Sequence, residues 1–348
     1  MRLVSGSGYV VANPAGREGV GRRLLQLGEA VWLGRELGRA VIVDWRDTLF
    51  LENKALNYFT EVFTPVPEIL GVPMHYVPSP SMGEYEQRGK GERLKLKPDA
   101  LARLGSEPGS APRYVIAGRS LALDRLPAYD AASYRSFLEG FYRRIVPRPD
   151  VAEQLEAWYD ANLRGHFVVG VNVSTGNGHF AKGARFEGHV NVRIFDNERR
   201  FLSTIATACE RATRGIPRVL RSGYKIFFAT DSGHMSEVLG RLPRAVTRRT
   251  VFPPPGVGRH YCDYDALGYS DRAAAADTVI DMLLLARCNA LIRNRSKFSS
   301  YALVSTGYFS GNVQEVEALY PKALARTNLR RIRALERRVA ARTTRRMS

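Results

Sequence analysis

Short apolar runs alternate with amphipathic segments along most of the chain. Ala40–Val43 and Phe167–Val173 are continuous runs rich in β-branched residues, which is typical of strands buried on both faces. Between such runs, apolar residues recur at 3.6-residue spacing, as they do from Leu24 to Leu37. Strands that alternate with helices in this way predict an α/β fold built on parallel sheets.

The pattern divides near Pro147-Arg148-Pro149-Asp150. Prolines disfavour a continuing helix, and ordinary domain sizes suggest two domains for 348 residues. We therefore expect an N-terminal Rossmann-like domain at residues 1–150 and a C-terminal nucleotide-binding domain at 151–312. A basic helix or tail is expected at 313–348.

The apolar run in the middle of the chain breaks into the loop Ser174-Thr175-Gly176-Asn177-Gly178-His179. A glycine-bearing loop at the carboxyl end of a parallel strand can present backbone N–H groups to an anionic ligand. Asn172, Gly176, Asn177 and Gly178 are therefore candidate ligand-binding residues.

A second glycine-rich turn, with Gly19 and Gly21, precedes the helix that begins near Arg22 and Arg23. Two interpretations fit this turn: a phosphate or acceptor loop, and a tight turn that binds no ligand. Two arginines on the first helical turn favour contact with an anion.

Charge changes the picture at the C-terminus. The net charge is +18, and residues 322–346 hold ten basic residues against the single acidic residue Glu336. Apolar residues recur there at roughly helical intervals, so a terminal helix is predicted. Three interpretations fit this helix: a solvated helix, a peripheral contact with an anionic membrane through residues 322–348, and an arm that binds nucleic acid. Of these partners, we do not expect nucleic acid.

Other features limit the compartment and the chemistry. No apolar run approaches the roughly 18 residues that a membrane span needs, and the N-terminus lacks the apolar core of a secretory signal. We expect a cytoplasmic protein, or one peripheral at the inner membrane face. Cys209, Cys262 and Cys288 are predicted to be thiols rather than disulfide or zinc partners.

A set of motifs in fixed order resembles a known family, the rhizobial nodulation fucosyltransferases, which are inverting α-1,6-fucosyltransferases of glycosyltransferase family 23. The matching segments are Gly38–Arg46, Arg148-Pro149-Asp150, Val169-Gly170-Val171 with Gly176-Asn177-Gly178, Ala229–Ser232, and Ile280–Cys288 with Ile292-Arg293 and Ser296–Tyr301. The resemblance implies a GT-B architecture, in which two Rossmann-like domains face a central cleft. It also implies an acceptor mainly on the first domain, GDP-fucose on the second, and neither a metal nor another cofactor.

Carried over position by position, the resemblance also implies roles for single residues. Asp231 and Asp281 would orient the base, the ribose or neighbouring cations, and Ser296 would hydrogen-bond phosphate. The donor side is expected to include the following residues: Asn172, Gly176, Asn177, Gly178, Asp231, Ser232, Ser296, Lys297 and Tyr301. Each carboxylate also has a structural interpretation, with Asp231 as a helix cap and Asp281 as the buried partner of an arginine such as Arg293. Ser296 likewise fits a helix cap.

The first motif departs from the family pattern, which reads His-Val-Arg where this chain has Asn172-Val173-Ser174. In the family that arginine contacts the donor pyrophosphate, whereas a serine hydroxyl offers a single neutral hydrogen bond. Ser174, Asp281 and His179 are the candidate catalytic residues, with His179 the candidate base. Arg22, Arg23 or Lys297 could supply the missing charge.

Three functions remain open from the sequence. The first is a glycosyltransferase that moves a sugar from GDP-fucose or a related nucleotide sugar to a glycan or glycolipid acceptor. The second is a catalytically inactive homologue that binds a sugar nucleotide or a glycan. The third is a basic nucleic-acid-binding protein.

Asp263-Tyr264-Asp265 spells the D-x-D of metal-dependent transferases, but it lies in a glycine- and proline-rich connection, and no metal site is expected.

Overall fold

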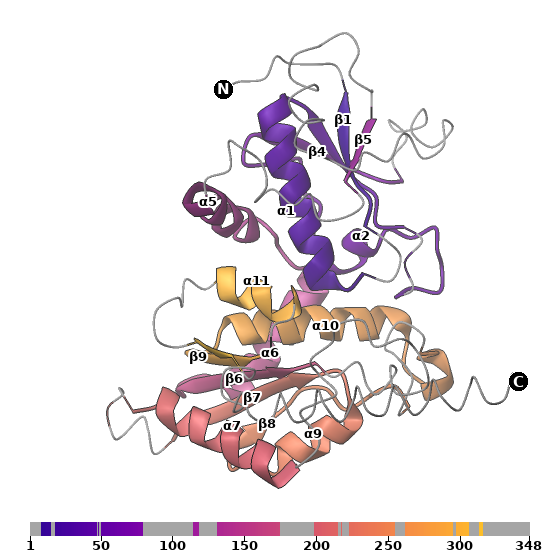
Figure 1. Cartoon of the computed structure of the whole chain (residues 1–348). Coiled ribbons are helices and arrows are strands. Elements are labelled where there is room, and N and C mark those ends of the chain that lie inside the picture. Colours follow the sequence, from indigo (N-terminus) through magenta and orange to yellow (C-terminus); the bar gives the residue numbers. More distant parts are fainter. Residues whose placement is uncertain are drawn as a thin grey trace, which may run out of the picture.

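The computed structural model describes residues 8–14, 18–46, 48, 50–78, 114–117, 131–174, 198–214, 217, 223–254, 262–294, 297–305 and 313–315. They form two α/β domains, each built on its own sheet (Figure 1). The predicted Gly176–Gly178 loop, His179, Ser296 and the basic tail lie outside these residues, as do all of 175–197 and 316–348.

The N-terminal sheet has the strand order β3-β4-β2-β1-β5. Its pairs are parallel except for the short antiparallel pair β3–β4. The strands are β1 (Tyr9–Ala12), β2 (Ala40–Val43), β3 (Glu68–Ile69), β4 (Val72–Tyr76) and β5 (Tyr114–Ala117).

The C-terminal sheet is parallel throughout, with the order β10-β9-β6-β7-β8. Read from the β8 edge and numbered in chain order, this arrangement is 3-2-1-4-5, which is the Rossmann arrangement and confirms the predicted fold class. The strands are β6 (Val168–Val173), β7 (Lys225–Thr230), β8 (Ala245–Val246), β9 (Ala290–Arg293) and β10 (Val313–Glu315). Because β10 pairs with β9, this domain extends past the expected end at residue 312.

Helices follow the strands as the alternating pattern predicts. In the N-terminal half they are α1 (Val20–Leu37), α2 (Tyr58–Val62), α5 (Ala131–Tyr142) and α6 (Pro149–Asn162). In the C-terminal half they are α7 (Glu198–Ala212), α9 (Gly233–Gly240), the 3₁₀ turn η6 (Asp265–Leu267), α10 (Asp271–Ala286) and α11 (Lys297–Ser305). Gly38 ends α1 in the left-handed conformation, with φ at 63°, which glycine adopts without strain.

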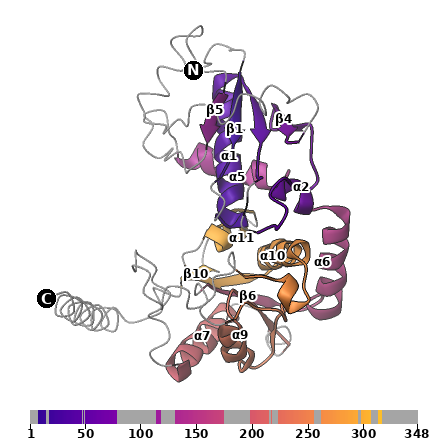
Figure 2. The ribbon, with the colours of Figure 1, turned by 90° about the vertical axis from the view of Figure 1, so that its right-hand side faces the viewer.

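The two faces of the C-terminal sheet pack against different partners. Val169, Val171 and Ile226 share a core with α7 and α9, whereas Phe227 and Leu291 belong to a core that continues into the N-terminal domain. The helices α10 and α11 lie between the two sheets (Figures 1 and 2). One apolar core therefore joins the domains.

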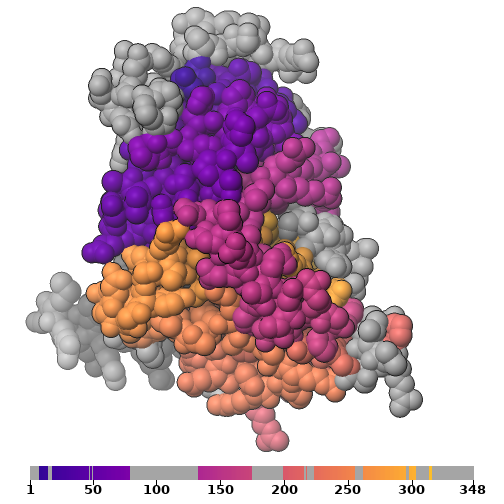
Figure 3. All heavy atoms as spheres, turned by 180° about the vertical axis from the view of Figure 1, so that it is seen from behind, coloured from indigo at the N-terminus to yellow at the C-terminus, as the bar shows by residue number. Residues whose placement is uncertain are grey.

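The helix α6 links the halves along the back of the molecule, where Figure 3 shows the magenta segment crossing from the indigo half to the orange half. Its N-terminus is tied to α10, because Arg272 lies 3.0 Å from Asp150 and 3.6 Å from Glu61 of α2. Among the described residues, no helix has the length and apolarity needed to cross a bilayer.

One predicted strand is much shorter than expected. The sequence predicts a strand from Ala245 to Phe252, closed by three prolines, but only Ala245–Val246 pairs with β7. The chain leaves the sheet at the next residues because Arg248 and Arg249 turn toward carboxylates on α10.

Candidate functional site

The carboxyl edge of the C-terminal sheet has a topological switch point between β6 and β9. Asn172 of β6 lies opposite Arg293 of β9 in the parallel register. The chain goes from β6 to α7 on one face of the sheet and from β9 to α11 on the other. In open α/β sheets, ligands bind at this position.

Asn294 hydrogen-bonds the end of β9 to the end of β6. Its backbone N–H donates to the carbonyl of Asn172 at 3.1 Å, and its Nδ2 donates to the carbonyl of Ser174 at 2.9 Å. The N–H of Ser174 donates in return to Oδ1 of Asn294 at 3.3 Å. Sequence reasoning did not single out Asn294, although its place directly after a buried strand was the available signal.

The side chains of the first motif are held differently. Asn172 is 1 % exposed, and its Nδ2 donates to the carbonyl of Ala229 on β7 at 3.2 Å. Ser174 is half-buried at the end of β6. Asn172 therefore helps to fix the sheet edge, while Ser174 lies at the surface of the edge where a ligand would bind.

Arg293 brings a buried guanidinium to the same edge. Its Nη1 donates to the hydroxyls of Ser299 and Ser300 at 3.3 Å each, and its Nη2 lies 3.6 Å from Glu315. The arginine is 7 % exposed, and it occupies the strand position beside Asn172. The sequence places Arg293 in a segment that matches the family and offers it as a partner for Asp281, whereas its guanidinium contacts Ser299, Ser300 and Glu315.

Asp281 pairs instead with Arg249, at 2.9 Å between Oδ2 and Nη2. One turn earlier on α10, Asp277 is held by Arg248 and by the hydroxyl of Tyr269. Burial and the neighbouring Asp277 raise the pKa of Tyr269. Both arginines come directly after β8, so the short strand places two cations against two carboxylates of α10.

The matching segment Ala229–Ser232 lies at the end of β7. Ser232 caps α9 by accepting a hydrogen bond from the N–H of Met235 at 3.4 Å. The cap that the sequence suggested for Asp231 therefore belongs to Ser232, and Asp231 is half-buried beside it.

Tyr301 is 4 % exposed and packs on Tyr142 of α5, with ring centroids 4.9 Å apart. Burial raises the pKa of Tyr301 to about 12. The prediction that Tyr301 lies on the donor side is wrong, because its position on α11 directs the side chain into the core between the domains. Lys297 is the first residue of α11.

The N-terminal glycine turn also differs from expectation. Gly19 is the N-cap of α1, and Gly21 is buried in the first turn. Arg23 is fully buried: its Nε donates to the carbonyl of Glu18 at 2.7 Å, and its Nη2 donates to Thr48 at 3.2 Å. Arg23 therefore does not offer a surface charge to an anion, whereas Arg22 is half-buried.

Aromatic rings surround the guanidinium of Arg23. Its Cζ lies 5.8 Å from the ring centroids of Trp45 and Tyr58 and 6.0 Å from that of Phe50. Burial lowers the pKa of Arg23 to about 10. These contacts indicate that Arg23 holds the fold together behind the carboxyl edge of the N-terminal sheet.

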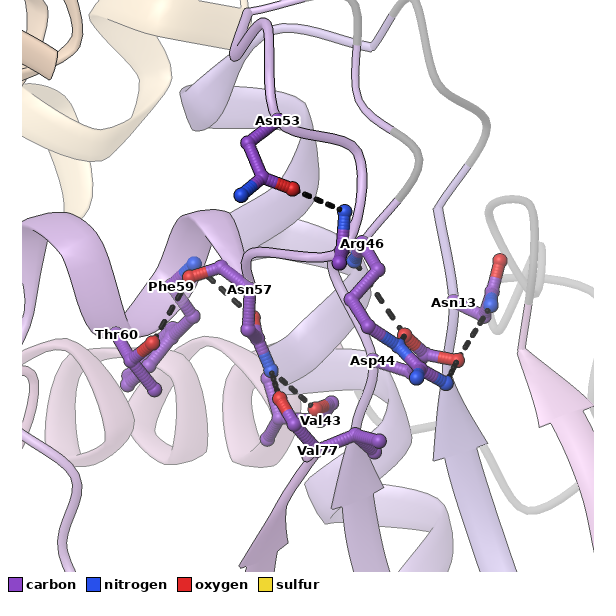
Figure 4. A network of polar contacts seen from close by, with 10 residues as sticks. Asn13, Val43, Asp44, Arg46, Asn53, Asn57, Phe59, Thr60 and Val77 are labelled. Atoms are coloured by element: carbon purple, nitrogen blue, oxygen red, sulfur yellow. Dashed lines mark hydrogen bonds and ion pairs between the residues drawn. The ribbon is translucent and has the colours of Figure 1, made fainter. Parts of the chain in front are cut away.

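A polar cluster lies at that carboxyl edge, where β1 and β2 end. Both carboxylate oxygens of Asp44 accept hydrogen bonds from Arg46, one from Nε at 2.9 Å and one from Nη2 at 3.2 Å. The side-chain amide of Asn13 also donates to this carboxylate, at 3.1 Å. Figure 4 shows Arg46 and Asn13 on either side of the carboxylate. Sequence reasoning noted Asp44-Trp45-Arg46 as part of a motif but gave it no role.

No group of three or more His, Cys, Asp or Glu side chains in the described parts of the chain is arranged to hold a metal ion. Asp263 instead accepts a hydrogen bond from the N–H of Ala266 at 3.0 Å, which stabilises the turn at η6.

Two Rossmann-type sheets, each with polar groups at its carboxyl edge, define a two-domain α/β protein of the nucleotide-binding class. The sequence model of the nodulation protein Z (NodZ) family matches residues 134–315, which is more than half of the chain. The chain belongs to the NodZ family.

Individual relatives agree with this assignment. Nodulation protein Z of Azorhizobium caulinodans is 26 % identical over 304 residues, covering 82 % of this chain and 87 % of the relative. Nodulation protein Z of Bradyrhizobium diazoefficiens is 25 % identical over 322 residues, covering 86 % and 80 %.

Solved structures share the fold. A crystal structure of NodZ α-1,6-fucosyltransferase soaked with GDP-fucose matches with a TM-score of 0.58 and 21 % identity, covering 86 % of this chain and 92 % of that one. POFUT1 in complex with GDP-fucose matches with a TM-score of 0.51 and 12 % identity, covering 90 % and 98 %. The fold is therefore of the GT-B type.

Proposed function

We propose that this protein is an inverting glycosyltransferase that moves fucose from GDP-fucose to a glycan or glycolipid acceptor. Membership of the NodZ family is the observation that carries the proposal, since a NodZ relative is an α-1,6-fucosyltransferase that was soaked with GDP-fucose. The switch point between β6 and β9 supports it, because an open α/β sheet binds a nucleotide at such an edge.

The reaction is a single displacement. An acceptor hydroxyl attacks the anomeric carbon of fucose from the side opposite the diphosphate, the bond to the diphosphate oxygen breaks, and the hydroxyl proton passes to a base. His179 is the candidate base. Holding both reactants in line lowers the entropic part of the barrier.

Positive charge at the donor edge would stabilise the departing diphosphate. We assign this task to Arg293, because it is a guanidinium at the strand position next to Asn172, and to backbone N–H groups of residues 176–178. Asp281, held by Arg249, orients the donor. With these groups the reaction requires neither a metal nor another cofactor.

Nucleotide preference tests the proposal. A ligand that binds only the folded state raises the melting temperature, so GDP should raise it more than UDP, CDP or ADP at equal concentration. An equal response to all four nucleotides would contradict the proposal.

A catalytically inactive binder is the second candidate, and Asn172-Val173-Ser174 is the observation that favours it, since no arginine stands in this segment. In that case GDP would still raise the melting temperature, but GDP-fucose would not be consumed. Measurement of released GDP separates the two functions.

A further inference from the structure

We infer that Asn13 and Arg46, positioned by Asp44, form a subsite for the sugar ring of the acceptor. This inference rests on the proposed transferase function and names where the second substrate binds. It assigns a ligand to a cluster at the carboxyl edge of the N-terminal sheet, away from the β6–β9 edge to which the donor is assigned.

Position is the first support. The strand order β4-β2-β1-β5 places a switch point between β1 and β5, and Asn13 is the residue that follows β1. Asp44 is the corresponding residue after β2, and its N–H donates to the carbonyl of Ala12 at 3.1 Å. The cluster therefore occupies the ligand-binding edge of its own sheet.

The loop after the cluster reaches the other domain. Asp271, at the start of α10, accepts a hydrogen bond from the backbone of Glu52. Figure 4 shows Asn53, which follows Glu52, on the same side of the strand ends as Arg46. The cluster thus lies on the side of its domain that faces the donor-binding domain.

Rigidity is the second support. Asn57 is 1 % exposed, and its Nδ2 donates to the carbonyls of Val43 at 2.8 Å and Val77 at 2.7 Å. Its Oδ1 accepts from the N–H of Phe59, so one side chain joins two strand ends to the start of α2.

Trp45, between the two charged residues, is fully buried and stacks on Tyr58 at 6.2 Å. Binding groups held in place by buried neighbours need little reorganisation when a ligand arrives.

Charge indicates the class of ligand. Asp44 is 5 % exposed and pairs with Arg46 on both oxygens, so the carboxylate neutralises the guanidinium. Two short contacts with a nearly buried carboxylate make Arg46 less suited to a diphosphate than Arg293, whose neighbour Glu315 is more exposed and lies 3.6 Å away, but the N–H groups of Arg46 still donate hydrogen bonds. The half-buried amide of Asn13 can both donate and accept. A neutral set of planar donors and acceptors suits the hydroxyls of a sugar.

The roles within the cluster follow from these contacts. The contacts that reach the Asp44 carboxylate include hydrogen bonds from the backbone and side chain of Arg46 and from Asn13. Asp44 is therefore a positioning residue, and the more exposed Arg46 and Asn13 contact the acceptor. The exposed fraction of the Arg46 side chain is 27 %, against 6 % for Asp44.

The test compares transfer with donor hydrolysis in the variants Asn13→Ala, Arg46→Lys and Asp44→Asn. The acceptor probes are β-linked oligosaccharides of glucose, galactose and N-acetylglucosamine. We expect Arg46→Lys and Asp44→Asn to raise the acceptor KM about 10- to 100-fold, because Arg46 donates from a charged group, and Asn13→Ala to raise it about 3- to 10-fold, the loss of a neutral hydrogen bond, while GDP-fucose hydrolysis and the GDP-induced melting shift stay unchanged. Arg164→Lys is the control for Arg46→Lys, because Arg164 also contacts an aspartate through Nε, at 2.7 Å, but on the exposed surface just after α6.

A parallel fall in hydrolysis and transfer, or a change in GDP affinity, would overturn the assignment, as would an unchanged acceptor KM. Saturation-transfer NMR with the same oligosaccharides and no donor gives a readout that is independent of catalysis. If the unaltered protein neither binds GDP nor consumes GDP-fucose, the proposed function fails. The subsite fails separately if the oligosaccharide signal is absent or is the same in the Asn13→Ala variant.

Discussion

Arg249 and Asp281 form an ion pair inside the C-terminal domain, with exposed side-chain fractions of 4 % and 3 % and a separation of 2.9 Å. A buried pair of this kind adds little net stability, but removal of one partner leaves an uncompensated buried charge. We expect Arg249→Met to lower the free energy of unfolding by about 3–5 kcal/mol, measured by urea denaturation.

The double variant Arg249→Met with Asp281→Leu separates stability from function. It should regain most of the lost stability, because both charges are gone. It should not consume GDP-fucose, because Asp281 is assigned to donor orientation. Turnover close to that of the unaltered protein would show that Asp281 is only structural.

The role of Arg293 at the donor edge can be tested by moving the arginine from position 293 to position 174. Arg293→Gln should reduce the rate of GDP-fucose hydrolysis by about 100-fold or more, since one preorganised electrostatic contact typically contributes that much. Ser174→Arg, combined with Arg293→Gln, should restore part of the rate, because residue 174 directly follows β6, the strand next to β9. An Arg293→Gln variant with full activity would remove Arg293 from the mechanism, and Arg293→Lys controls for charge.

The cysteines should differ sharply in reactivity. Burial raises the pKa of Cys209 to about 12 and also raises that of Cys288, so little thiolate forms at pH 8. Cys262 is half-buried. We expect a thiol reagent to modify one group rapidly in the folded protein and three after denaturation. Rapid modification of two or more groups without denaturant would contradict the burial of Cys209 and Cys288.

Arg23 gives a prediction about stability alone. Arg23→Met removes a guanidinium that contacts Trp45 and Tyr58 and hydrogen-bonds Thr48, and should cost roughly 2 kcal/mol of unfolding free energy. The GDP-induced melting shift should be unaffected. Loss of that shift in a folded variant would return Arg23 to the donor site.

Hydrophobic periodicity predicted much of the fold, because the buried strands and α10 carry continuous apolar patterns. It overestimated β8, since the pattern of 245–252 does not reveal that Arg248 and Arg249 turn toward α10. Periodicity also could not identify Arg249 as the partner of Asp281, because ion pairs between distant segments depend on tertiary packing. Asn13 and Asn294 each directly follow a buried strand, which is a weak local signal, and their contacts become evident only when adjacent strand ends are seen together.

The most direct test of the central claim is the consumption of GDP-fucose by the purified full chain. Released GDP and free fucose are measured beside parallel reactions with GDP-mannose and UDP-galactose, and NMR identifies the anomer that is formed first. We predict slow hydrolysis of GDP-fucose in preference to the other two donors, with inversion at the anomeric carbon. No turnover of GDP-fucose with or without acceptor, or equal turnover of all three donors, would contradict the assignment as a fucosyltransferase.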